Sequence, residues 1–241
     1  MQSSLYKIAT SLEALKETPF KKERELQSLF EANLSQIMGL MLVRSEFAIK
    51  NKRIDTLAFD PESKAFVIIE YKRDCNSSVV DQGFTYLSLM LQNKADFILE
   101  YNEQYPKTQL SRQEVDWSQS RVVFVSSDFT ENQIEATNFK DIAIELYEVK
   151  RYGDHLLIAP IKKSKAAERV KPITRQNKVY QSVADEIKVY TEENQLNNKS
   201  EEVVALYEKY KAAILNLTEN IEVKPQKWYI AFKKDRRNIC D

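Results

Sequence analysis

The sequence predicts an α/β protein in which helices flank a mixed β-sheet, followed by a small α+β unit. Short apolar runs bounded by turn residues indicate strands, and apolar positions at 3-4 spacing between them indicate helices. A turn of only a few residues at Asp60–Lys64 requires two of the strands to be antiparallel. With 241 residues, 43% of them hydrophobic, the chain can form one large domain or two small ones.

The predicted elements follow one another as helix, three strands, helix, strand, helix and hairpin. The first helix covers residues 21–38, and the turn at Asp60–Lys64 joins strands 53–59 and 65–73. The run Phe66–Ile69 is apolar on both faces, so this strand should lie inside the sheet. The other expected elements are a strand at 45–50, a helix from Ser78, a strand at 122–125, a helix at 130–139, and paired strands at 142–149 and 156–161.

Three segments are expected along the chain. They are a domain over residues 1–161, a basic linker over 162–178 and a small α+β unit over 179–241. Two helices and one strand are expected in the last unit, which is little for an independent core. This unit is therefore either incomplete or docked on the first domain.

The composition excludes several kinds of site. One histidine, two cysteines and three glycines leave no structural zinc site, no disulfide scaffold and no glycine-rich phosphate loop. His155 follows the turn residues Gly153-Asp154, so it belongs to a hairpin rather than to a catalytic triad. Any active site must be built from carboxylates, lysines and a hard metal ion.

Membrane insertion and secretion are not expected. The chain has no run of about 20 apolar residues, and its first residues lack a basic start followed by an apolar segment. We therefore expect a cytoplasmic protein with no membrane partner.

Charge is unevenly distributed although the net charge is zero. Residues 1–160 hold 19 Lys and Arg against 24 Asp and Glu, whereas residues 161–241 hold 17 against 12. The basic excess is densest from Lys162 to Arg175. This stretch either contacts phosphates or is a solvated linker.

Three charged residues on the predicted hairpin carry the functional argument. Strand alternation places Glu70 and Lys72 on one face, about 7 Å apart, and Asp55 lies on the neighbouring strand. Buried charges need partners, and two adjacent carboxylates repel unless a hard divalent cation such as Mg²⁺ lies between them. A metal-bound water near Lys72 would attack a phosphate. The alternative is a structural ion pair of Lys72 with Glu70 or Asp55.

The spacing of Asp55 and Glu70-Tyr71-Lys72 resembles the PD-(D/E)XK nuclease superfamily, which has the restriction-endonuclease-like fold. Ile54 stands where the nominal motif has proline. The resemblance implies that Asp55 and Glu70 bind Mg²⁺, with Mn²⁺ as a substitute, and that Lys72 positions the attacking water.

Two further segments resemble the same superfamily. Gln82 and Tyr86 are similar to the Q-x-x-x-Y motif of RecB-like nucleases and lie on one face of the second helix. The alternative is that Gln82 is an ordinary surface residue and Tyr86 an ordinary core residue. Family members often carry a glutamate on the first helix that completes the metal site. Glu23 is the first candidate and Glu31 the alternative, unless both belong to a solvated acidic stripe.

Residues 53–57 and 69–73 also resemble a group of bacterial proteins that join such a domain to a small C-terminal domain of unknown function, and residues 228–234 resemble the start of that domain. The resemblance implies a Mg²⁺-dependent DNA endonuclease; the alternative is a catalytically silent domain that binds nucleic acid or a protein. The expected partner is DNA, and a homodimer is left open. Phosphate contacts are expected from Arg53, Arg73, Lys162, Lys163 and Lys165.

Overall fold

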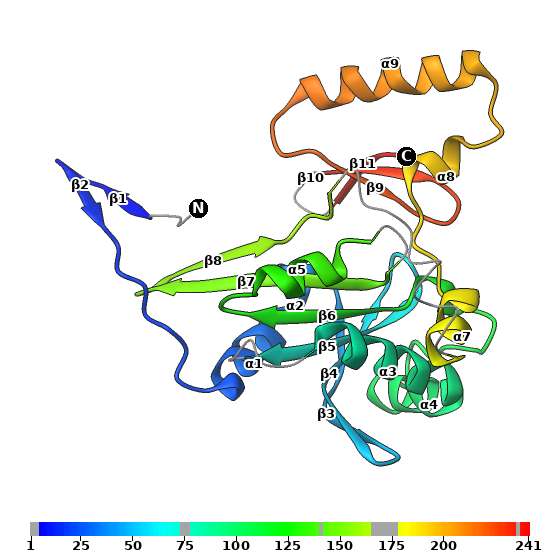
Figure 1. Cartoon of the computed structure of the whole chain (residues 1–241), viewed down its shortest axis with the longest axis horizontal. Helices are drawn as coiled ribbons and strands as arrows, with labels where there is room; N and C mark the ends of the chain where they lie inside the picture. Colours follow the sequence, from blue (N-terminus) through cyan, green and yellow to red (C-terminus); the bar gives the residue numbers. More distant parts are fainter. Residues whose placement is uncertain (1–4, 73–77, 140–141, 165–177, 235–236) are drawn as a thin grey trace. The chain divides into compact units, whose positions relative to one another are not determined.

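The computed structural model describes residues 5–72, 78–139, 142–164, 178–234 and 237–241 (Figure 1). Its contacts divide the chain into two units, Met1–Ile187 and Lys188–Asp241. The first unit contains the larger sheet and the residues from which a site was expected.

A six-stranded sheet forms the centre of the first unit, in the order β3-β4-β5-β6-β7-β8. Its strands are β3 (Met41–Ile49), β4 (Lys52–Asp60), β5 (Ala65–Lys72), β6 (Arg121–Ser126), β7 (Ile144–Tyr152) and β8 (His155–Pro160). β4 is antiparallel to both of its neighbours, β3 and β5; β5, β6 and β7 are parallel, and β8 returns antiparallel to β7. The predicted α/β class with a mixed sheet is confirmed, as are the β4–β5 hairpin and the interior position of β5.

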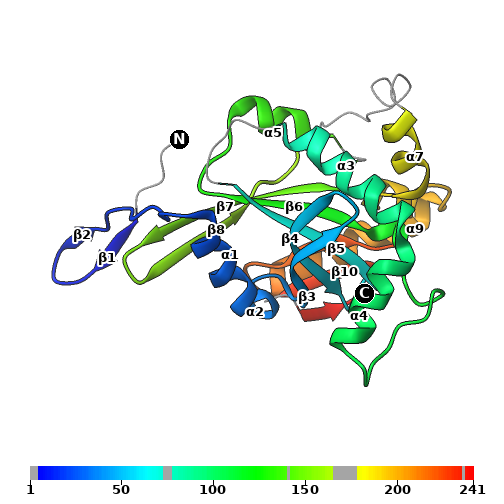
Figure 2. The same cartoon turned by 90° about the horizontal axis from the view of Figure 1, so that it is seen from below.

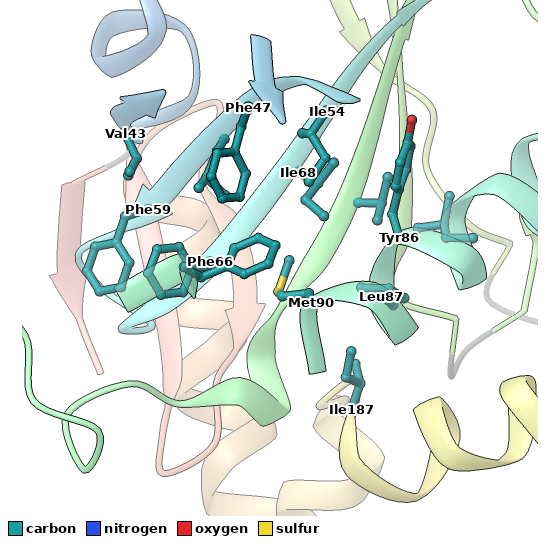
Figure 3. Close-up of a cluster of buried hydrophobic side chains, with 14 of the residues drawn as sticks. Val43, Phe47, Ile54, Phe59, Phe66, Ile68, Tyr86, Leu87, Met90 and Ile187 are labelled. Carbon is teal, nitrogen blue, oxygen red and sulfur yellow. The ribbon is translucent and has the colours of Figure 1, made fainter. Parts of the chain in front are cut away.

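Helices cover both faces of this sheet (Figure 2). On one face, α1 (Glu23–Ala32) and α2 (Leu34–Met38) bury Leu26, Phe30 and Leu34 against residues of β4, β5 and β6. The other face is covered mainly by α3 (Val79–Gln92) and α4 (Lys94–Gln104). Figure 3 shows Phe66 and Ile68 of the sheet together with Leu87 and Met90 of α3 in the core on that face.

The chain connects β5 to the parallel strand β6 through α3, α4 and the short 3₁₀ helix η1 (Trp117–Gln119). Ser78 begins α3 as its N-cap, accepting a hydrogen bond from the backbone N–H of Asp81, as predicted. Gly83 allows α3 to approach the sheet closely, because a Cβ atom there would lie 2.4 Å from the side chain of Ile144. The neighbouring residue Gln82 is thereby carried close to the strand ends.

Several boundaries differ from the prediction. The first predicted helix is divided at Asn33, whose side chain donates to the carbonyl of Leu29 (2.8 Å), and β3 begins four residues earlier than expected. The hairpin of β1 (Tyr6–Ile8) and β2 (Leu12–Ala14) and helix α4 were not predicted. α5 (Glu131–Thr137) and the β7–β8 hairpin lie where helix and hairpin were expected.

The first unit extends to Ile187, a residue in the segment from which the C-terminal unit was expected. α7 (Lys178–Glu186) packs on α3, with Tyr180 stacked on Phe84 at a centroid distance of 4.1 Å. Val183 and Ile187 join the core of the first unit. These aromatic and aliphatic contacts outweigh the polar appearance of this helix in the sequence. Most of the predicted linker lies outside the described residues.

The second unit has an α+β composition. It contains α8 (Glu192–Leu196), α9 (Glu201–Leu217) and a sheet in the order β11-β10-β9, formed by β9 (Glu222–Pro225), β10 (Ile230–Lys234) and β11 (Arg237–Cys240). Tyr207 of α9 lies against Phe232 of β10. The one strand predicted here is therefore accompanied by two more. In the described part of both units, no helix is long and apolar enough to cross a membrane.

Candidate active site

Asp55, Glu70 and Lys72 lie together on the β4–β5 hairpin. The regular pairing of the two strands extends from Asp60 opposite Ala65 to Thr56 opposite Ile69. Asp55 and Glu70 are the next residues on each strand, so their side chains meet just beyond the last regular pair. Glu70 faces α3 together with Phe66 and Ile68, as strand alternation predicts.

Each of these two carboxylates accepts a hydrogen bond from a backbone N–H group of the hairpin. The backbone N–H of Asp55 donates to Oε1 of Glu70 (3.2 Å), and the backbone N–H of Tyr71 donates to Oδ2 of Asp55 (3.0 Å). Burial raises the pKa of Asp55 above its ordinary value, against the opposing effects of the Tyr71 N–H and the Lys72 charge. The two carboxylates are thus held close together, and the charge of Asp55 disfavours ionisation of Glu70.

Glu70 has a strongly perturbed pKa. It is only 2% exposed. Burial first, and the nearby Asp55 charge second, raise its pKa to about 7. The Lys72 ammonium lies 3.7 Å from Oε2, which is too far for a close ion pair to offset these two effects. Negative charge at Glu70 is therefore costly in the protein as it stands.

The predicted pair on α3 contacts this carboxylate. Gln82 Nε2 donates to Glu70 Oε2 (3.0 Å) and lies 3.2 Å from the hydroxyl of Tyr86. The Tyr86 hydroxyl donates to the backbone carbonyl of Arg53 (3.3 Å). One turn of α3 thus fixes the position of Glu70 and connects it to β4. An open pocket of about 330 Å³ adjoins the pair, lined by Lys52, Ser78, Asp81, Gln82, Thr85 and Tyr86.

The two first-helix candidates differ in their surroundings. Glu31 accepts hydrogen bonds from Gln27 (3.0 Å) and from the hydroxyl of Thr56, which places it on the α1 face of the sheet, opposite Glu70. Glu23 is exposed, and its charge makes a small contribution to raising the pKa of Asp55. Within the described ranges, no three His, Cys, Asp or Glu side chains form a group that could hold a metal. The structure brings together two of the expected carboxylates and not a third.

The remaining donors still suit one kind of cation. Mg²⁺ binds through one or two carboxylates and keeps several of its waters, and Asp55 with Glu70 supplies that number. In the described part of the chain, Oδ1 of Asp55 accepts no hydrogen bond, whereas Oδ2 accepts one from Tyr71. The paired oxygens fit a hard cation and do not fit a nitrogen- or sulfur-seeking metal.

The predicted phosphate contacts fall into three groups. Arg53 is 70% exposed and forms an ion pair with Glu46 (2.8 Å), and Lys162 is exposed. Lys163 instead donates to the backbone carbonyls of Phe139 (2.9 Å) and Ile142, which favours a structural role. Arg73 and Lys165 lie outside the described residues.

Two residues near Asp55 were not singled out by the sequence. Gln27 is buried on α1 and donates to the backbone carbonyl of Asp55 (2.9 Å). Glu46 of β3 has a φ of 53° and acts on the pKa of Asp55 through its charge. The stripe that Gln27 shares with Glu23 and Glu31 at helical spacing was the available signal for Gln27; no signal marked Glu46.

The fold and the site define a mixed α/β protein with two carboxylates and a lysine at the ends of adjacent strands. No protein-family model matches the sequence. An uncharacterized protein of Haemophilus influenzae is 55% identical over 231 residues, which cover 95% of this chain and 76% of that protein. The chain belongs to the family of that protein.

Two solved structures are similar to part of this chain in the arrangement of their backbones. One is a repair endonuclease from Pyrococcus abyssi, with a TM-score of 0.33 and 18% identity over 55% of this chain and 49% of the other. The second is the EndoMS–dsDNA complex, with a TM-score of 0.29 and 14% identity over 61% of this chain and 64% of the other. The match spans about half the length of the repair endonuclease.

Proposed function

We propose that the protein is a Mg²⁺-dependent endonuclease that hydrolyses phosphodiester bonds of DNA. The observation that carries the proposal is the meeting of Asp55, Glu70 and Lys72 at the end of one hairpin. Glu70 is nearly inaccessible and insufficiently neutralised, a combination more typical of a functional site than of a structural ion pair. Asp55 and Glu70 would hold the cation, with Mn²⁺ as a substitute.

The chain's own residues would divide the remaining tasks. When bound, Mg²⁺ acts as a Lewis acid and lowers the pKa of a coordinated water. Gln82 holds Glu70 from α3, so that the carboxylate keeps one orientation. The Lys72 ammonium lies beside Glu70, where it can orient the attacking water and stabilise the negative charge that develops on the phosphate. Hydrolysis forms a bond from the water oxygen to phosphorus and breaks one ester bond; the leaving oxygen takes up a proton.

Metal-dependent nicking of supercoiled plasmid by the full chain tests this proposal. Wild-type protein should nick DNA with Mg²⁺ and not with EDTA, and Asp55→Ala should abolish nicking. Asp96→Ala is the matched control, because Asp96 is an exposed acid on α4 and should cut at the wild-type rate. The proposal would be wrong if the wild-type protein cut none of three DNA forms: single-stranded, double-stranded and mismatched.

Two observations favour a second candidate, a nuclease-like domain that binds DNA without cutting it. Glu23 and Glu31 do not join Asp55 and Glu70, and Lys72 lies where a structural partner of Glu70 would lie. A protein that shifts DNA in a gel but nicks none of these forms with Mg²⁺ or Mn²⁺ would establish this candidate.

A further inference from the structure

Asp55 departs from the regular sheet on both sides. Toward β3, the pairing passes from Ser45 opposite Thr56 to Phe47 opposite Ile54, and Glu46 between them has a φ of 53°. Left-handed backbone is uncommon for a residue other than glycine, and such residues gather at functional sites. Toward β5, the regular pairs end at Thr56. Asp55 is thus the point at which the pairing of β4 with β3 is interrupted for one residue, and beyond which its pairing with β5 does not continue.

Other groups replace the missing strand contacts of Asp55. Its backbone N–H donates to the carboxylate of Glu70, and its carboxylate accepts from the backbone N–H of Tyr71. Its backbone carbonyl accepts from Nε2 of Gln27 at 2.9 Å. Gln27 is the one group in this set that comes from the opposite face of the sheet and not from the β4–β5 hairpin.

Gln27 is itself firmly held. It is 7% exposed, and its Nε2 also lies 3.3 Å from the hydroxyl of Ser45 and 3.0 Å from Oε1 of Glu31. Glu31 in turn accepts from the hydroxyl of Thr56, the residue that follows Asp55. The amide therefore joins α1 to β3 and β4 at the position where the pairing of these two strands is interrupted.

We propose that Gln27 is a positioning residue for Asp55, and that Glu31 serves as its anchor. The inference rests on the proposed function and assigns a role that the metal ligands themselves do not supply. By donating a hydrogen bond to the Asp55 carbonyl, Gln27 keeps Asp55 out of the β3–β4 ladder. It thereby also keeps the Asp55 carboxylate turned toward Tyr71 and Glu70. Without that donor, the carbonyl needs another partner, and β4 can return to regular pairing with β3.

Hydrogen exchange in the metal-free protein provides the first measurement. The Tyr71 N–H reports the position of Asp55, because it donates to Oδ2 of that residue. In Gln27→Leu, which keeps a similar volume but removes the donor, exchange at Tyr71 should rise at least 10-fold more than exchange at Ile69. Gln133→Leu is the matched control: Gln133 is also a buried glutamine, on α5, and its replacement should lower stability without selective exchange at Tyr71.

The Mg²⁺ dependence of the melting temperature provides the second measurement. Loss of a residue that orients a metal ligand typically weakens metal affinity about 10–100-fold. Gln27→Leu should therefore need at least 10-fold more Mg²⁺ for half of the wild-type shift, and Gln133→Leu should need the wild-type amount. If Gln27→Leu does not fold, Gln27→Asn, which is one methylene too short, should show the same two selective effects.

The two measurements separate the possible failures. Equal changes in exchange at Tyr71 and Ile69 would overturn the positioning role, whatever the metal response. A selective rise at Tyr71 in a protein whose wild type shows no Mg²⁺ shift would support the role of Gln27 and remove the metal site. Wild-type Mg²⁺ affinity in Gln27→Leu would likewise overturn the inference.

Discussion

The strands β4 and β5 carry a cluster of charged side chains at each end, and the two clusters differ in how their charges are neutralised. At one end, Asp60 Oδ2 lies 3.0 Å from Nη2 of Arg121, and its Oδ1 accepts backbone N–H groups from Glu62 and Ser63. At the other end, the Lys72 ammonium lies 3.7 Å from Oε2 of Glu70. Both carboxylates are buried.

This difference distinguishes a structural cluster from a candidate site. Asp60 has its charge matched by close donors, and Glu145 adds a second carboxylate 3.2 Å from Nε of Arg121. Glu70 has burial and the Asp55 charge acting against it, which raise its pKa to about 7. A buried cluster that does not satisfy its own charges is the one expected to gain from a ligand.

The largest expected effect is on stability, at the satisfied end. Arg121→Ala leaves the buried Asp60 carboxylate without its guanidinium, and removing one partner of a buried pair costs about 3–5 kcal/mol of unfolding free energy. The Mg²⁺-induced shift in melting temperature should remain, because Arg121 lies at the opposite end of the strands. Chemical denaturation with and without Mg²⁺ measures both quantities.

An exposed pair serves as the control for Arg121. Arg44 lies 3.3 Å from Glu100 and its side chain is 57% exposed, so Arg44→Ala should have little effect on stability. Equal losses in the two variants would contradict the distinction between buried and exposed pairs. Loss of the Mg²⁺ shift in Arg121→Ala would show that the two ends of the strands are coupled.

The next largest effect is on cleavage, at the unsatisfied end. Lys72→Ala should fold, bind Mg²⁺ and bind DNA, but cut at least about 10²-fold more slowly in single-turnover assays, as expected for loss of one electrostatic stabiliser. Lys72→Arg should not restore the rate, because a planar guanidinium cannot replace a compact ammonium at a water-sized position. Cleavage at the wild-type rate by Lys72→Ala would exclude the proposed mechanism, whereas a variant that merely unfolds would indicate a structural ion pair.

A smaller effect is expected for Glu70→Gln in the metal-free protein. The folded-state pKa of Glu70 is about 7 and its ordinary value is 4.5, so the folded protein binds this proton more tightly than the unfolded chain. The contribution of Glu70 to stability is therefore complete below pH 4.5 and is lost as the pH rises through 7. At pH 8 the neutral amide should stabilise the folded state by about 1 kcal/mol, less than full neutralisation, because its NH₂ group faces that of Gln82.

Melting curves from pH 5 to pH 8, in EDTA and in Mg²⁺, measure this effect. Relative to wild type, Glu70→Gln should gain stability as the pH rises and should lose most of the Mg²⁺ shift. A constant difference in stability between the two proteins across this pH range would show that the pKa of Glu70 is not raised in the folded state. An unchanged Mg²⁺ shift would place the cation elsewhere.

The sequence predicted the hairpin and the cluster at Glu70, but not the contacts that connect this cluster to α3. Alternation along β5 and the short turn after Asp60 placed Glu70 and Lys72 beside Asp55, because pairing and side-chain direction follow from local rules. Helical spacing placed Gln82 and Tyr86 on one face of α3. Their contact with Glu70 depends on the close packing of α3 at Gly83, which no local pattern specifies.

The positions that the sequence did not resolve depend on contacts across the fold. Glu31 belongs to the same acidic stripe as Glu23, yet it faces Thr56 and not the metal candidates, because α1 lies on the other face of the sheet. The left-handed backbone at Glu46 has no glycine to mark it. Arg121 stands just before the strand predicted at 122–125 and was given no role, since its partner Asp60 is distant in sequence.

The smallest expected effect concerns two adjacent lysines. One has its charge engaged within the fold and the other is exposed, so they should differ in DNA binding. Lys163 is engaged with the carbonyls of Phe139 and Ile142, whereas Lys162 is exposed. Lys162→Gln should lower the slope of log affinity against log salt by about 1, as for one lost phosphate contact, with unchanged stability. Lys163→Gln should leave that slope unchanged and cost about 1 kcal/mol of unfolding free energy, as for a lost hydrogen bond. DNA-binding titrations at several salt concentrations, paired with denaturation, separate the two lysines; the opposite pattern would place Lys163 on the DNA surface and Lys162 outside it.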